Sequence, residues 1–187
     1  MHKHYVFGYG SLVNTRTHGY PDARPALLSG WRRVWRGTAL APQAFLSVEP
    51  AQAEINGLVA AVPDADWAAL DAREHGYDRQ GVVHGIAHDL PGDAAVQVYA
   101  VPDRHRLPAD RSPILLSYLD VVVQGFLHQF GQDGAAHFFT TTAGWDRPAI
   151  DDRAAPIYPR HQVLTAAERA RVDGHLADLQ VTIVAPD

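Results

Sequence analysis

The sequence predicts an α+β fold, in the form of a small mixed β-barrel or a strongly bent sheet with helices at its periphery. Short β-prone runs recur between Gly, Pro and Asp breakers, a spacing typical of small barrels and bent sheets. Three other segments have the apolar spacing and the end signals of helices. With 187 residues, 47% of them hydrophobic, the chain can bury one ordinary core, and we expect a single domain over residues 1–187.

The predicted strands lie in the first hundred residues. The first covers residues 3–8 and leads into a turn flanked by glycines, and the second covers residues 26–37. Further strands are predicted at residues 44–48, 55–62, 80–88 and 95–101. Within the second strand we expect two core tryptophans edged by solvated charges: Trp31 and Trp35, with Arg32, Arg33 and Arg36.

Three helices are predicted between and after these strands. The first opens at Asp64, has an aspartate cap at its start, runs to Glu74 and is stopped by Gly76. The second is expected over residues 113–130 and the third over residues 166–179. The intervening residues 140–164 lack a clear periodicity and contain several breakers, so they are predicted to form a loop region.

The composition narrows the classes of function. The net charge of −5 arises from scattered side chains, without the basic stripe that a nucleic-acid backbone requires. Because the chain has no cysteine, disulfides, thiol nucleophiles and thiolate metal sites are excluded. No run of eighteen apolar residues occurs and the start has no long apolar segment, so we expect no membrane partner and a cytoplasmic location.

The first candidate site is the turn that follows the first strand, in the segment Tyr5-Val-Phe-Gly-Tyr-Gly-Ser-Leu12. Glycines on both sides of Tyr9 let the backbone take a positive φ or come close to a ligand. The N–H groups of Gly10, Ser11 and Leu12 can then converge on an anion. Taken alone, such a turn also has a plain structural explanation.

The second candidate is Glu74, at the end of the first helix. Steps of three and four residues place Trp67, Leu70 and Asp71 on the same face as Glu74, so the carboxylate continues an apolar stripe. Burial there raises a carboxyl pKa, which suits a general base or acid. The alternative is that Glu74 pairs with Arg73 or Arg79, or lies in water at a frayed helix end.

The chain turns directly after Glu74 and enters the next strand. On that strand Tyr77 and Arg79 alternate, so an aromatic anchor and a cation can line the same pocket. Each of the two has an alternative explanation as core or as solvated surface.

Phe7-Gly-Tyr-Gly-Ser-Leu12 together with Leu70-Asp-x-x-Glu74-x-Gly-Tyr-x-Arg79 resembles the γ-glutamylcyclotransferase-like superfamily, including its AIG2-like members. The order, the separation and the expected local structures of both motifs agree with that family. Pro113-Ile-Leu-Leu-Ser-Tyr118, followed by Gly125, is similar to a helix with a Pro-Ser-x-x-Tyr type pattern in relatives, although Ser117 and Tyr118 are adjacent here. The resemblance is strongest over residues 5–130.

This resemblance implies an enzyme that cleaves a γ-glutamyl compound by cyclisation and releases 5-oxoproline with an amine or amino acid, without a cofactor. It implies that Tyr9, Gly10, Ser11 and Leu12 hold the γ-glutamyl group and that Glu74 transfers the proton. Arg79 and Tyr118 are further candidates for substrate binding. The leaving group cannot be read from the sequence.

The residue types also suit this chemistry without reference to the family. A γ-glutamyl amide contains its own nucleophile, the α-amino group, so no Ser or Cys nucleophile is needed. The remaining tasks are to deprotonate the α-ammonium, stabilise the oxyanion and protonate the leaving nitrogen. The turn can hold either the substrate carboxylate or the oxyanion, and the sequence leaves both open.

Other functional readings fit less well. A serine nucleophile elbow needs a glycine two residues after the serine, where Val13 stands, and no Gly-Lys-Ser/Thr of a P-loop follows. The histidine pairs His2/His4 and His84/His88 lack a metal-ligand signature, so no metal site is predicted. Residues 157–161 place a tyrosine, an arginine and a histidine in a Pro-rich loop that can cover the site, although ordinary packing is the preferred interpretation.

The alternative from another class is a binding module without catalysis, which uses the same pocket to recognise a small metabolite or a partner. The carboxylate at position 74 argues against it, because a charge on an apolar helix face costs stability unless it is used or paired.

Overall fold

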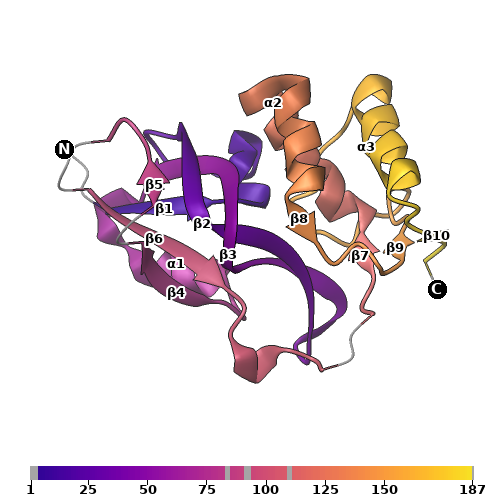
Figure 1. Ribbon diagram of the computed structural model, residues 1–187, viewed down its shortest axis with the longest axis horizontal. Coiled ribbons are helices and arrows are strands. Elements are labelled where there is room, and N and C mark those ends of the chain that lie inside the picture. Colours follow the sequence, from indigo (N-terminus) through magenta and orange to yellow (C-terminus); the bar gives the residue numbers. More distant parts are fainter. Residues whose placement is uncertain (1–3, 83–84, 91–93, 109–110, 187) are drawn as a thin grey trace.

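The computed structural model describes residues 4–82, 85–90, 94–108 and 111–186. Its centre is a seven-stranded sheet with the order β4-β6-β1-β3-β2-β5, and β8 pairs with β2. The sheet curls into a half-barrel, and three α-helices lie at its periphery (Figure 1). The predicted α+β class with a strongly bent sheet is therefore confirmed.

The middle of the sheet is built around β1 (His4–Gly8). This strand pairs antiparallel with β3 and parallel with β6 (Ala95–Ala100), which in turn pairs antiparallel with β4 (Asp78–Val82). The single strand predicted over residues 80–88 is divided, because β5 (Ile86–Ala87) pairs with β2 at the other edge of the sheet. Gly85, with a φ of 81°, reverses the backbone before β5.

Two long strands, β2 (Arg24–Thr38) and β3 (Ala41–Ala61), form a hairpin that gives the sheet its curl. The strands predicted at residues 44–48 and 55–62 are one continuous strand, although Pro50 lies between them. Pro50 lies opposite Trp31, next to a register shift between Ser29 and Trp31. At the shift one residue of β2, Gly30 with a φ of 84°, faces three residues of β3, 51–53. A bulge of this kind tolerates a proline and bends the hairpin without ending it.

The helices are α1 (Trp67–Arg73), α2 (Leu116–Thr140) and α3 (Ala166–Asp178). The α1 helix is shorter than predicted, because a 3₁₀ turn over Pro63–Ala65 precedes it and the capping side chain is that of Asp66. The α2 helix begins three residues later than predicted and runs ten residues further, through a kink at Gly131 with a φ of 68°. The α3 helix begins at the predicted residue with a capping box of Thr165 and Glu168.

The remaining elements are short. A second sheet has the order β10-β9-β7 and is parallel throughout. Its strands are β7 (Ile114–Leu115), β9 (Ala149–Ile150) and β10 (Ile183–Val184). Two short strands, β9 and β8 (Thr142–Ala143), lie inside the predicted loop region. Single 3₁₀ turns occur at Ser11–Val13, Thr15–Thr17 and Asp103–His105.

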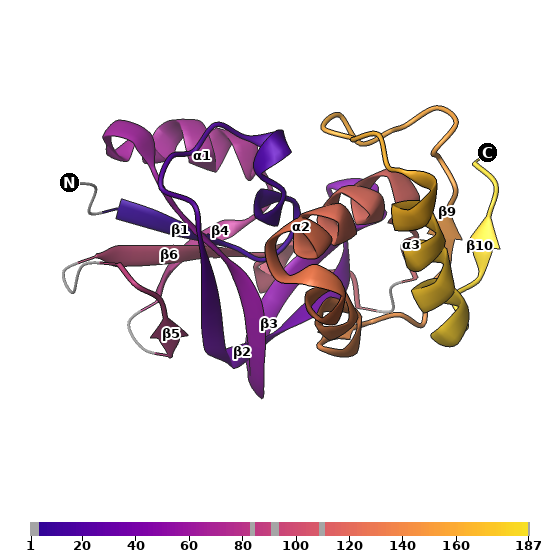
Figure 2. The same cartoon turned by 90° about the horizontal axis from the view of Figure 1, so that it is seen from above.

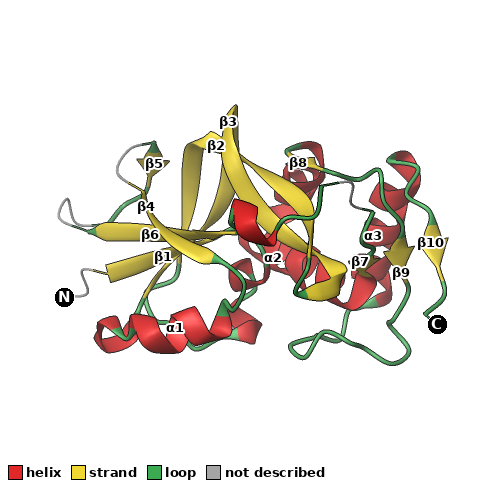
Figure 3. Cartoon of the chain, turned by 90° about the horizontal axis from the view of Figure 1, so that it is seen from below, coloured by secondary structure: helices red, strands yellow, loops and turns green. Residues whose placement is uncertain are grey.

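The helices cover different parts of the sheet. Figure 2 shows α1 beside β1 and β6, whereas α2 and α3 lie next to each other toward the C-terminal end. The same separation is visible from below in Figure 3. In the part of the chain that the structure describes, no helix combines the length and the apolar character needed to cross a membrane.

The main core fills the space between the curled sheet and α2. Its largest fully buried side chains include Trp35, Phe126 and Phe138. A smaller cluster under α1 contains Val6, Leu70 and others. Trp35 is a core residue as predicted and Trp31 packs against the core.

One prediction about this region is wrong, because Arg33 is not a solvated charge. Its exposed fraction is 0%, and its guanidinium lies 4.7 Å from the ring centre of Phe126. The guanidinium donates hydrogen bonds to the carbonyl oxygens of Tyr9 and Asn56 and to the Thr141 hydroxyl. These partners offset the cost of burying the charge.

Candidate active site

In the glycine-flanked turn after β1, neighbouring side chains come too close to the glycines to leave room for a Cβ atom. A Cβ atom on Gly8 would lie 2.5 Å from the Leu12 Cβ, and one on Gly10 would lie 2.7 Å from the Tyr118 hydroxyl. The φ of Gly10 is −126°, so a positive φ is not the reason for a glycine there. The turn is therefore packed directly against α2, which carries Tyr118.

Hydrogen bonds of Arg33 and Tyr9 hold this turn in place. The Arg33 Nε donates to the Tyr9 carbonyl at 2.9 Å, and the Tyr9 hydroxyl donates to the Tyr99 carbonyl at 2.7 Å. Both side chains are buried. The turn thus has its backbone tied to β2 and its tyrosine tied to β6, which keeps the Ser11 and Leu12 backbone in a fixed position.

Glu74 is the C-cap residue of α1, and its N–H donates to the Leu70 carbonyl at 2.9 Å. Gly76 follows with a φ of 97° and turns the chain toward β4. The side chain of Glu74 is 19% exposed, and its Oε1 accepts from the Arg73 Nε at 3.1 Å. Burial raises the pKa of the Glu74 carboxyl, while the charge and hydrogen bond of Arg73 act in the opposite direction.

The turn and Glu74 face two adjoining cavities. The outer cavity has a volume of about 180 Å³ and the inner one about 30 Å³. Both are lined by Ser11, Leu46, Glu74, Tyr77 and Tyr118. The inner cavity is further lined by the turn residues and nearby side chains: Phe7, Gly8, Tyr9, Gly10, Leu12 and Tyr99.

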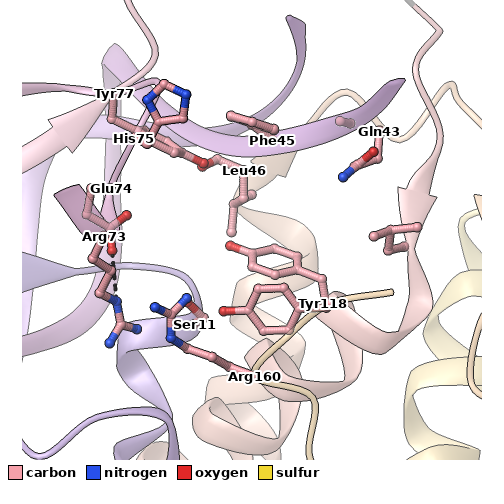
Figure 4. A pocket seen from close by; sticks show the side chains of 13 residues that line it. Ser11, Gln43, Phe45, Leu46, Arg73, Glu74, His75, Tyr77, Tyr118 and Arg160 are labelled. Carbon is pink, nitrogen blue, oxygen red and sulfur yellow. Dashed lines mark hydrogen bonds and ion pairs between the residues drawn. The ribbon is translucent and has the colours of Figure 1, made fainter. Parts of the chain in front are cut away.

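The outer cavity widens away from the turn. Its additional lining includes Gln43, Phe45, Arg73, His75, Tyr158 and Arg160. Figure 4 shows Glu74, Tyr118 and Arg160 reaching the same space from α1, α2 and the loop before α3. Residues far apart in the sequence therefore form one wall.

Tyrosine side chains contribute several polar groups to these cavities. Burial raises the pKa of Tyr9, Tyr77 and Tyr118 well above the usual value, so all three stay neutral. The Tyr77 hydroxyl donates to the Leu46 carbonyl at 3.0 Å. The Tyr118 hydroxyl oxygen accepts from the Ser11 backbone, and its ring packs edge-on against Tyr158 at 4.9 Å.

A comparison with protein families adds an independent observation. Residues 6–117 match the model described as gamma-glutamyl cyclotransferase, AIG2-like. The chain belongs to this family. The matched region includes the turn after β1, Glu74 and the start of α2, and it ends before the loop that carries Arg160.

Solved structures have a similar fold. YkqA from Bacillus subtilis has a TM-score of 0.55 and 15% identity over 75% of this chain, which spans only 55% of YkqA. The uncharacterized protein loc79017 from Homo sapiens has a TM-score of 0.57 and 13% identity, covering 90% of this chain and 97% of that chain. At these identities the likeness concerns the fold alone, and no curated protein matches the chain.

Most of the candidate residues come together at these cavities of the AIG2-like fold. Tyr9, Gly10, Ser11 and Leu12 line the inner cavity, and Glu74 and Tyr118 line both. The predicted alternative for Glu74, a pair with Arg73, is also present. Pairing and a position in the cavity wall are therefore compatible for this carboxylate.

Arg79 lines neither cavity, unlike its expected neighbour Tyr77. Its guanidinium lies 4.4 Å from the ring centre of Trp67 and 3.5 Å from a carboxylate oxygen of Asp71. Tyr77 precedes β4, which begins at Asp78, so the alternation of side chains along a strand does not place Tyr77 and Arg79 on the same face. Arg79 lies against α1 instead of the site.

The sequence did not identify the cations that do line the outer cavity. Arg73 was considered only as a partner of Glu74, and Arg160 only as part of a loop for which packing was preferred. The Pro-rich composition around Tyr158 and Arg160 was the available signal. It could not show which element the loop packs against.

The histidine pairs do not produce a metal site where the structure describes them. His2 and His84 lie outside the described residues. Among the described ones, no group of three or more His, Asp or Glu side chains is placed to hold a metal ion.

Proposed function

We propose that this chain is an enzyme that cleaves a γ-glutamyl compound by intramolecular cyclisation, releasing 5-oxoproline and an amine or amino acid. The observation that carries the proposal is the position of Glu74, whose partly buried carboxylate lines the same two cavities as the turn of Tyr9 to Leu12. Membership of the AIG2-like family supports the same reaction class.

In the proposed reaction, the α-amino nitrogen of the substrate attacks its own γ-carbonyl carbon. A C–N bond closes the five-membered ring, and the C–N bond to the leaving amine breaks. The α-nitrogen enters as an ammonium and ends as the ring N–H, so it loses two protons. Glu74 accepts them one after the other, first from the α-ammonium and then from the ring nitrogen of the tetrahedral intermediate, and passes each to the leaving nitrogen, which departs as an ammonium, so the enzyme ends unchanged. Since the nucleophile is part of the substrate, the cyclisation needs neither a covalent enzyme intermediate nor a cofactor.

The raised pKa of Glu74 suits this double role. A carboxylate that holds a proton more tightly than usual is a stronger base toward the α-ammonium. Arg73 limits the rise, because its charge and its hydrogen bond favour the ionised carboxylate, the form that accepts a proton.

The sizes of the cavities suggest how a substrate is placed. The inner cavity, of about 30 Å³, is much smaller than the outer cavity of about 180 Å³, so the bulkier part of a substrate fits the outer one. We assign the α-amino and α-carboxylate end of the γ-glutamyl group to the region next to Tyr9, Gly10, Ser11 and Leu12. The neutral hydroxyl of Tyr118 contributes a further polar contact there.

The test is to incubate the protein with a panel of γ-glutamyl amino acids and γ-glutamyl amines and to measure 5-oxoproline. Glu74→Gln is expected to lower kcat/KM by about 10²- to 10⁴-fold, the usual contribution of a general acid–base group. Glu54→Gln is the matched control, because Glu54 is exposed and lines neither cavity.

If no compound yields 5-oxoproline, or if Glu74→Gln is as fast as the parent protein, the proposed mechanism is wrong. Binding of a γ-glutamyl compound without any product would instead support a binding module that uses the same pocket.

A further inference from the structure

The loop before α3 completes the outer cavity, although it lies beyond the residues that match the family model. The match ends at residue 117, whereas Tyr158 and Arg160 line the outer cavity. Neither residue lines the inner cavity next to the turn. This loop therefore contacts the part of the pocket that faces away from the proposed γ-glutamyl subsite.

Asp152 fastens the loop to the start of α2. Its carboxylate accepts from the Ser117 N–H at 2.8 Å, from the Ser117 hydroxyl at 2.5 Å and from the Ile157 N–H at 2.9 Å. The Ser117 hydroxyl oxygen in turn accepts from the Tyr158 N–H at 3.2 Å. Since Asp152 is 1% exposed, these bonds are shielded from water and hold the loop in place.

A second fastening lies next to it. Arg153 makes two hydrogen bonds of 2.7 Å to Asp120 on α2 and one of 2.7 Å to Asp173 on α3. The side chains of Arg153 and Asp120 are 9% and 7% exposed. The chain segment that leads to Arg160 is thus tied to both C-terminal helices, which favours a preformed position for the guanidinium.

Arg160 has no partner of its own in the described part of the chain. Its guanidinium forms no ion pair and no hydrogen bond with a described residue, whereas Arg73 is held by Glu74 and by the Thr17 carbonyl. It is close enough to Glu74 for its charge to act on that carboxylate. A cation in a cavity wall without a hydrogen-bond partner among the described residues is available to an anion of the ligand.

The charges that line the outer cavity also favour an anionic ligand group. Its described lining contains two arginines, Arg73 and Arg160, and one carboxylate, Glu74, apart from the titratable His75. A γ-glutamyl amino acid carries two carboxylates and one ammonium, whereas a γ-glutamyl amine carries one of each. The excess positive charge of the cavity therefore complements the amino-acid form.

We propose that Arg160 is a specificity-determining residue that binds the carboxylate of the leaving amino acid, so that γ-glutamyl amino acids are preferred over γ-glutamyl amines. This inference rests on the proposed function for the placement of the substrate. With the γ-glutamyl end at the turn and the scissile bond at Glu74, the leaving group lies in the outer cavity, where Arg160 is.

The test compares two substrates that differ only in this carboxylate, γ-glutamylalanine and γ-glutamylethylamine. The parent protein is expected to favour γ-glutamylalanine in kcat/KM by about 10- to 100-fold, the value of a charge-assisted hydrogen bond. Arg160→Gln is expected to lower kcat/KM for γ-glutamylalanine by about 10- to 100-fold more than kcat/KM for γ-glutamylethylamine, mainly through KM, so that the preference is lost. Arg160→Lys restores part of the preference, and Arg171→Gln, on the exposed face of α3, is the matched control.

Equal activity of the parent protein toward both substrates would overturn the inference and leave the proposed function intact. An equal loss for both substrates in Arg160→Gln would also overturn it. If neither substrate yields 5-oxoproline, the binding of the same two compounds is measured by calorimetry. A preference for γ-glutamylalanine that Arg160→Gln abolishes then supports the carboxylate subsite without catalysis. Binding without that preference, or no binding, contradicts the subsite as well.

Discussion

Glu74 occupies a position where a charged side chain costs stability. Burial raises the pKa of its carboxyl, and Arg73 compensates only in part. Since the folded protein binds this proton more tightly than the unfolded chain, the stability is fully present below the unfolded value of 4.5 and is lost as the pH rises through the folded pKa. A stability cost at neutral pH is expected of a residue kept for chemistry and not for folding.

The proposed role of Glu74 predicts the pH dependence of turnover. The acid limb of kcat/KM is expected to have its midpoint above 4.5, the ordinary value of a glutamate carboxyl. Arg73→Gln is expected to move this midpoint to higher pH, because the Arg73 charge lowers the pKa. The measurement is a pH profile of 5-oxoproline formation. A midpoint below 4.5, or a shift to lower pH in Arg73→Gln, would contradict the assignment.

At the scale of elements, α2 is the part of the molecule on which the site is assembled. Its first turn carries Tyr118, which contacts the turn after β1, and Ser117, which holds the loop before α3. Two segments more than a hundred residues apart in the sequence thus meet at neighbouring positions of one helix. Asp152 is the buried acceptor that joins this loop to Ser117.

Asp152→Ala is expected to lower the free energy of unfolding by about 3 kcal/mol, because it leaves buried donors without an acceptor. Faster hydrogen exchange is expected at the Ile157 and Tyr158 amides. The control is Asp151→Ala, since Asp151 is exposed and accepts only one long bond, from the Arg153 N–H at 3.3 Å. Equal effects of the two substitutions in denaturant unfolding would show that Asp152 does not anchor the loop.

At the scale of the whole molecule, Arg33 joins segments that are far apart in the sequence. From β2 it bonds to the turn after β1, to β3 and to Thr141 at the end of α2, and it lies under the rings of Phe126 and Phe138. Burial lowers the pKa of its guanidinium. An arginine nevertheless remains charged at neutral pH, so its hydrogen bonds are those of a cation.

Arg33→Met is expected to lower the free energy of unfolding by about 3–5 kcal/mol, as when a buried charged group with several partners is removed. The neighbouring Arg32→Met provides the control, because Arg32 pairs with Glu49 at the surface with a side chain that is 49% exposed. That substitution is expected to cost about 1 kcal/mol or less. Urea unfolding of both variants measures the difference, and a cost for Arg33→Met no larger than for Arg32→Met would refute the role of Arg33.

The structural elements were predicted best where local signals define them. The turn after β1, the start of α3 and most strands follow from glycines, apolar spacing and β-prone runs close together in the sequence. The errors arose where tertiary contacts override local signals. Pro50 does not end β3, because it lies beside a bulge in which residues 51–53 face Gly30. Likewise, α2 continues beyond residue 130 through the kink at Gly131.

The sequence by itself determined the two halves of the candidate site, the turn of Tyr9 to Leu12 and the carboxylate of Glu74, because each depends on spacing within about ten residues. Only the tertiary structure decided that Arg33 is buried, that Arg79 points away from the cavities and that Arg160 lines the outer one. These three outcomes depend on contacts between segments far apart in the chain. The same side chain is solvated or buried according to what packs against it, and nothing in its local sequence records that partner.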